Sequence, residues 1–262
     1  MAKRRRQWNQ GVYERYLSEG RGCGEGKEYK PWIRIQDFAS QGVVSRIYSR
    51  KTGRIHHLLS NNELHYFYLL EWSEKIIDIR EQFPLTDVET AMGIAASAGI
   101  VYPTDRTSGF PYVMTCDFML TTEDGLKART IKQVSELLNP RVIQKLEVER
   151  RYWDKKGIDW KIVTDNDIDV PKARAIEWAR QGSNNICADP MLLAEAAKRF
   201  RETNSPVATA GSIDREFRLP AGTGLTIFKH LIHARLVEPK DSFTVGAVNL
   251  GVLQPYRGIW QC

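Results

Sequence analysis

The sequence has little cysteine and no long apolar run, and each absence excludes a class of protein. Four cysteines occur among 262 residues, and no two of them form a C-x-x-C pair. A zinc site built on cysteine is therefore not expected, and reduced thiols fit the chain better than a disulfide framework. No stretch approaches the roughly 18 uncharged apolar residues of a membrane-spanning helix. We expect no membrane association.

The first residues also lack the pattern of a secretory signal. Met-Ala-Lys-Arg-Arg-Arg is followed by Gln7 and Trp8 rather than by an apolar segment. A cytoplasmic protein is the expectation. Hydrophobic residues make up 42% of the chain and charged residues 27%, which are ordinary values for a folded protein of one or two domains.

The positive charge is concentrated near the start of the chain. The net charge is +6, and residues 1–30 hold eight basic and four acidic residues. Tryptophan and tyrosine are interleaved with them, which suits a phosphate backbone. We predict a basic N-terminal arm over residues 1–30, with DNA contacts from Lys3, Arg4, Arg5 and Arg6. A solubilising or disordered tail is the alternative explanation.

The pattern after residue 31 predicts a mixed α/β sheet covered by helices. A hairpin is expected from strands at 43–49 and 54–58 around a glycine turn. Apolar periodicity then predicts the following order: helix 60–72, strand 75–83, helix 87–97, strands 113–120 and 127–134, helix 140–156 and strand 159–164. This α/β domain, the larger of the two expected, should span residues 31–183.

A second, smaller domain is predicted for residues 184–262. The composition becomes polar and rich in glycine and asparagine around 181–189, which is typical of a domain boundary. Short helices are expected at 191–203, 212–217 and 225–234, followed by a small β wing that includes 242–248. Three helices and a wing indicate a winged-helix-like module.

Two charged side chains on neighbouring strands form the main candidate site. Asp117 lies within an otherwise apolar strand, and Lys132 lies on the next strand across a short turn. A buried carboxylate is costly unless it is paired or binds a cation. A structural Asp117–Lys132 salt bridge is one interpretation, and a divalent-metal nuclease site is the other.

Further carboxylates are needed if the site binds a metal. Glu63 qualifies if the helix that begins near Ser60 packs its first turn at the end of the sheet, although Ser-x-x-Glu is also a capping box. Glu147 and Glu149 point to different helix faces because they are two residues apart, so at most one of them faces the site.

Several segments resemble the TnsA family, the endonuclease subunits of heteromeric cut-and-paste transposases. They include GRGCGEGKEYKPW at 20–32, HHLLSNNEL at 56–64 and DIREQFPL at 78–85. The resemblance continues through CDF at 116–118, IK at 131–132 and KLEVERRYW at 145–153. It implies a restriction-endonuclease-like core followed by a winged-helix-like C-terminal domain.

The resemblance also implies roles for individual residues. Glu63 and Asp117 match metal-binding carboxylates, and Lys132 matches the catalytic lysine. The backbone carbonyl of Ile131 would complete the metal shell, and Glu149 matches a supporting acidic position. The implied cofactor is Mg²⁺, with Mn²⁺ as a substitute.

One position departs from the broader nuclease signature. Thr130 stands two residues before the lysine, where many nucleases carry an acid, and TnsA-type enzymes also lack that acid. The resemblance implies cleavage at the 5′ ends of a transposon. The expected partners are DNA, a TnsB-type transposase and a TnsC-type AAA+ regulator, in the nucleoid of a bacterial cell.

Two other functions remain compatible with the residues. A stand-alone repair or restriction endonuclease would share the chemistry without the transposition partners. A DNA-binding assembly factor would keep the fold without catalysis.

Overall fold

The computed structural model describes residues 7–37, 43–180 and 189–238. The contacts divide the chain into two compact units, Met1–Ile168 and Asp169–Cys262. The predicted basic residues Lys3, Arg4, Arg5 and Arg6 and the predicted wing at 242–248 lie outside the described residues.

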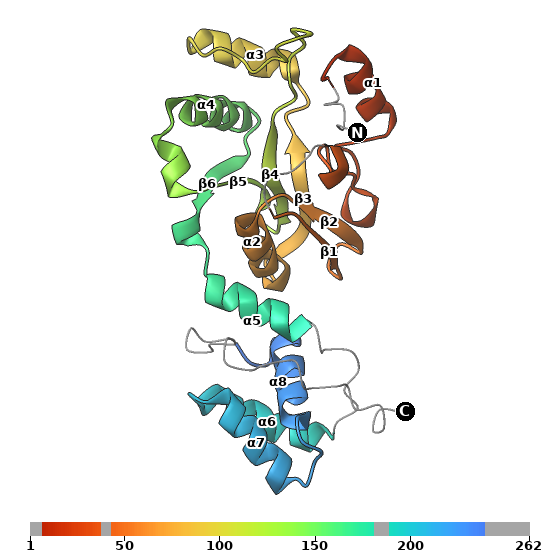
Figure 1. The fold of residues 1–262 in the computed structure, drawn as a ribbon, viewed down its shortest axis with the longest axis vertical. Coiled ribbons are helices and arrows are strands. Elements are labelled where there is room, and N and C mark those ends of the chain that lie inside the picture. Colours follow the sequence, from red (N-terminus) through yellow and green to blue (C-terminus); the bar gives the residue numbers. More distant parts are fainter. Residues whose placement is uncertain (1–6, 38–42, 181–188, 239–262) are drawn as a thin grey trace, which may run out of the picture. The chain divides into compact units, whose positions relative to one another are not determined.

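The centre of the first unit is a four-stranded mixed sheet in the order β3-β4-β5-β6 (Figure 1). The strands are β3 (Ile76–Pro84), β4 (Thr115–Thr122), β5 (Gly125–Lys132) and β6 (Asp159–Thr164). β3, β4 and β5 pair antiparallel, whereas β5 and β6 are parallel. The parallel pair requires a crossover, which helix α4 (Pro140–Lys155) supplies. The mixed α/β prediction is therefore confirmed.

Helices surround this sheet. α2 (Asn61–Trp72) contacts β3 and β5, α4 contacts β6, and α3 (Val88–Ser97) packs against α4. Tyr152 and Trp153 of α4 share a core cluster with Met119 of β4 and Ala128 of β5. Cys116 is fully buried in the same cluster, as expected of a core cysteine rather than a nucleophile.

A separate hairpin precedes α2, as predicted. β1 (Ser45–Ser49) and β2 (Arg54–Leu58) pair antiparallel around a turn that contains Gly53 with φ of +71°. The hairpin is tied to β3 by the buried Arg54, which bonds both carboxylate oxygens of Glu81 at 2.8 and 2.5 Å. His56 adds a 2.7 Å contact from its Nδ1 to the same carboxylate.

The N-terminal segment packs against this unit. Helix α1 (Gln10–Ser18) follows Trp8, whose ring contacts Tyr16 and Trp32 edge-on. Arg21 is 5% exposed and pairs with Asp37 at 2.5 Å, so this arginine of the predicted arm is a structural residue. The glycine-rich loop at 20–26 is closely packed, since a Cβ on Gly22 would lie 2.4 Å from the Pro84 ring.

The second unit is helical in its described part. α6 (Pro190–Glu202), α7 (Pro206–Glu216) and α8 (Thr223–His233) enclose a core that includes Phe200, Ile213 and Leu231. Helix α5 (Val170–Arg180) was not predicted, and its Trp178 belongs to the same core. α5 therefore falls in the second unit, whereas the sequence placed the boundary near 183/184. No helix in the described ranges is long and apolar enough to cross a membrane.

Candidate active site

The β4–β5 hairpin brings Asp117 and Lys132 together, as the sequence predicted. The pairing of the two strands ends at Phe118 and Arg129. Beyond it, the Asp117 carboxylate accepts a hydrogen bond from the Ile131 N–H at 2.6 Å. Lys132 Nζ lies 3.8 Å from Asp117 Oδ2 and donates to the Ile131 carbonyl at 2.7 Å. The carboxylate and the carbonyl therefore contact the same ammonium group.

Glu63 reaches this site from the first turn of α2. Ser60 caps the helix, because its hydroxyl accepts a hydrogen bond from the Glu63 N–H at 3.1 Å. The Glu63 carboxylate in turn accepts from the Leu59 N–H at 3.0 Å and from the Ser60 hydroxyl at 2.9 Å. Glu63 is 6% exposed and thus both caps the helix and turns its carboxylate toward the sheet.

Gln82 joins the two carboxylates, and sequence reasoning missed it. Its Nε2 lies 3.4 Å from Glu63 Oε2 and 3.4 Å from Asp117 Oδ1. The residue has φ of +48°, in the left-handed region that side chains rarely adopt, and is 2% exposed. The only available signal was its place in the segment DIREQFPL, which carries the family resemblance.

The electrostatics show a site that is short of positive charge. Burial, together with the nearby Asp117, raises the pKa of Glu63 to about 8. Burial also raises the pKa of Asp117, although Lys132 opposes the shift. Burial alone would lower the pKa of Lys132, but the surrounding carboxylates, led by Asp117, raise it. Lys132 therefore stays charged, and a further cation would favour the ionised carboxylates.

Glu149 lies beside this site and contacts it through Thr130. Its Oε1 accepts hydrogen bonds from the Thr130 hydroxyl and from Trp160 Nε1, the latter at 2.9 Å. Burial raises the pKa of Glu149 to about 7. Glu147 is on the outer face, where it pairs with Arg150 at 2.8 Å. The expectation that only one of the two glutamates faces inward is confirmed.

The donor atoms suit a hard divalent cation. Mg²⁺ and Mn²⁺ prefer oxygen ligands, and Glu63, Asp117 and the Ile131 carbonyl supply only oxygen. Across the described ranges, no group of three or more His, Cys, Asp and Glu side chains is arranged to hold a metal ion. A metal at this site would therefore depend on neutral oxygen atoms in addition to the two carboxylates.

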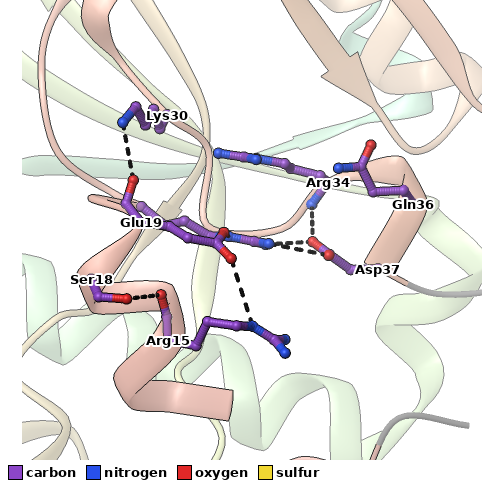
Figure 2. Close-up of a pocket in the computed structure, with 8 residues that line it drawn as sticks. Arg15, Ser18, Glu19, Lys30, Arg34, Gln36 and Asp37 are labelled. Carbon is purple, nitrogen blue, oxygen red and sulfur yellow. Dashed lines mark hydrogen bonds and ion pairs between the residues drawn. The ribbon is translucent and has the colours of Figure 1, made fainter. Parts of the chain in front are cut away.

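A pocket of about 560 Å³ lies apart from these residues, in the N-terminal segment (Figure 2). Arg15, Lys30 and Arg34 line it, with the buried Arg21. Glu19 and other polar residues complete the lining, so the pocket carries both signs of charge. None of the predicted catalytic residues lines it.

The mixed sheet and helix α2 together bring two carboxylates and a lysine to one site, an arrangement suited to metal-dependent hydrolysis. The family model of the TnsA-like endonuclease N-terminal domain matches residues 73–165, which include Asp117 and Lys132. The transposon Tn7 transposition protein TnsA of Escherichia coli is 44% identical over 181 residues, covering 68% of this chain. The match spans 65% of the length of that relative. Residues 73–165 therefore resemble the TnsA-like endonuclease N-terminal domain, and the chain as a whole is similar to TnsA.

Proposed function

We propose that this chain is the metal-dependent DNA endonuclease subunit of a heteromeric transposase. Its reaction is hydrolysis of the phosphodiester at the 5′ ends of the transposon, which leaves 3′-hydroxyl and 5′-phosphate ends. The observation that carries the proposal is the convergence of Glu63, Asp117 and Lys132 from three different elements. The similarity to the Tn7 transposition protein supports transposition as the setting.

Each residue has a role that follows from its contacts. Glu63, Asp117 and the Ile131 carbonyl would hold Mg²⁺, which when bound polarises the scissile phosphate and lowers the pKa of water. Lys132 remains charged beside Asp117 and is placed to orient the attacking water and to offset the charge that develops on the phosphate. Glu149 positions the end of β5 through Thr130.

Residues 184–262, most of the second unit, are proposed to serve partner docking and DNA contact. Residues 184–262 carry a net charge of only +2, from nine basic and seven acidic residues. Such a low charge favours protein contact over tight independent DNA binding. We propose a winged-helix-like module here, with a TnsC-type AAA+ regulator as its partner. A TnsB-type transposase would cut and join the 3′ ends.

Strand-specific cleavage of transposon ends tests the proposal. The wild type and the Lys132→Ala and Asp117→Ala variants would be assayed with Mg²⁺ and the cognate partner proteins. The 5′ nicks should disappear in both variants while 3′ joining persists, because the two strands use different active sites. The exposed Glu123 offers a control, since Glu123→Ala should cleave like the wild type.

Two results would contradict the proposal in different ways. If Asp117→Ala cuts both strands as well as the wild type, the nuclease is another protein and this chain is an assembly factor. If the wild type cuts plain DNA without partners and without preference for transposon ends, it is a stand-alone endonuclease.

A further inference from the structure

Gln82 occupies the space between the two carboxylates that the proposed function assigns to metal binding. Its amide nitrogen is 3.4 Å from an oxygen of Glu63 and 3.4 Å from an oxygen of Asp117. Both distances are longer than the 2.7–3.2 Å typical of N–H···O bonds. The amide therefore lies against both carboxylates without a short bond to either.

The backbone of Gln82 holds the side chain in this place. Its neighbours Glu81 and Phe83 pair with Phe118 and Cys116 of β4, so Gln82 lies on β3 beside Asp117. Its carbonyl accepts a hydrogen bond from the Trp32 N–H at 3.2 Å. A left-handed φ is strained for a residue with a side chain, and such strain persists at functional sites.

The amide can present either its nitrogen or its oxygen to the carboxylates. The Thr115 hydroxyl lies 3.3 Å from Gln82 Oε1, where it acts as a donor. A hydroxyl is both a donor and an acceptor, so Thr115 also satisfies the amide after a half-turn about the last side-chain bond. That half-turn places Oε1 beside Glu63 and Asp117.

A third side-chain oxygen is what this site lacks. The hydroxyl of Thr130, on β5, is bonded to Glu149 instead. The metal site would otherwise consist of two carboxylates and the Ile131 carbonyl. An amide oxygen is a ligand that hard divalent cations accept.

We propose that Gln82 is a metal ligand, and that its Oε1 joins Glu63 and Asp117 in holding the divalent cation. This inference rests on the proposed function, because it assumes a divalent cation at that site. The amide nitrogen faces the carboxylates in the metal-free protein, and the oxygen replaces it when the cation binds. Gln82 thereby supplies the third side-chain oxygen of the site.

Direct Mn²⁺ binding tests this without relying on cleavage. The full chain would be titrated with Mn²⁺ by calorimetry, as wild type, Gln82→Gly, Gln82→Glu and Asp117→Asn. Glycine removes the side chain and tolerates the positive φ, so this variant should fold. Gln144, exposed on α4, gives the matched control Gln144→Ala. Unfolding temperatures in EDTA check the folding of every variant.

We expect Gln82→Gly to raise the Kd for Mn²⁺ at least tenfold, and Gln82→Glu to bind as tightly as the wild type or more tightly. The glutamate variant separates the two roles of the amide, because a carboxylate supplies an oxygen but cannot donate a hydrogen bond. Gln144→Ala should bind like the wild type.

Three outcomes would overturn the inference. If Asp117→Asn binds weakly and Gln82→Gly binds normally, Gln82 is not a ligand and the proposed function stands. If Gln82→Glu binds as weakly as Gln82→Gly, the amide acts as a donor only. If the wild type and Asp117→Asn both fail to bind Mn²⁺ or bind it equally, the metal site of the proposed function fails together with this inference.

Discussion

Replacing Glu63 by glutamine should stabilise the metal-free protein at neutral pH. The folded-state pKa of Glu63 is about 8, because burial and Asp117 disfavour the charge, whereas an unfolded glutamate has a pKa near 4.5. The folded protein therefore binds this proton more tightly than the unfolded chain does. Its contribution to stability is fully present below pH ~4.5 and is lost as the pH rises toward 8.

The size of the effect follows from the interval between these values. Between pH 4.5 and pH 7, the free energy of unfolding falls by at most ~1.4 kcal/mol per pH unit. Over these ~2.5 units the loss is about 3 kcal/mol. Glutamine does not titrate and keeps an oxygen to accept the Leu59 N–H bond. Glu63→Gln should thus be more stable than the wild type by about 3 kcal/mol at pH 7, a shift of roughly 6–12 °C in Tm. The difference should vanish near pH 4.5.

Thermal unfolding in EDTA at pH 4.5, 6, 7 and 8 measures this. The exposed Glu123 provides a control, because Glu123→Gln should leave the pH dependence unchanged. Added Mg²⁺ should stabilise the wild type, because its ionised carboxylates bind the ion. The difference in unfolding temperature between the variant and the wild type should therefore become smaller. A Glu63→Gln variant that is no more stable at pH 7 than the wild type would refute the argument from burial. A stability difference between the variant and the wild type that does not depend on pH would refute it as well.

Other predictions concern the supports of the site and the second unit. Arg54→Ala should destabilise the protein by about 3–5 kcal/mol in urea unfolding, since it leaves the fully buried Glu81 charge without its main partner; a loss below 1 kcal/mol would contradict this. Gly224→Ala should destabilise the second unit by about 1–3 kcal/mol, because its Cβ would lie 2.3 Å from a backbone oxygen of α7. Gly93→Ala, with open space around the Cβ, should be neutral or stabilising, and equal effects would refute the packing argument. Glu149→Gln should keep cleavage within about threefold of the wild type because it retains the accepting oxygen, whereas Glu149→Ala should lose more than tenfold; equal losses would mean that the charge itself is required.

The order of the elements in the first unit was predictable because each one is specified locally. Ser60 and Asn139 cap α2 and α4 through their side chains, and Pro140 begins α4. The tight turn between β4 and β5 makes them neighbours, which is why the approach of Lys132 to Asp117 could be expected. Local signals suffice when the partners are close in sequence.

Helix α5 was missed because its local signals are weak. Apolar side chains occur on most of its surface, and Ala173, Ala175 and Ala179 are as buried as Ile176 and Trp178. A helix that is buried on several sides lacks the clear apolar stripe by which an exposed helix is recognised. Its membership in the second unit depends on contacts with α8, far along the chain.

The sequence by itself predicted the mixed α/β fold, because caps, turns and strand alternation act over a few residues. The three candidate catalytic residues followed from its resemblance to the TnsA family. Only the tertiary structure decided the place of Gln82, since its left-handed backbone moves the side chain away from simple strand alternation. It also decided that Arg21 is structural. The burial of this arginine depends on its pairing with Asp37, which lies 16 positions further along the chain. Long-range packing sets the surroundings of a charged or amide group, and those surroundings determine whether it supports the fold, binds a ligand or takes part in catalysis.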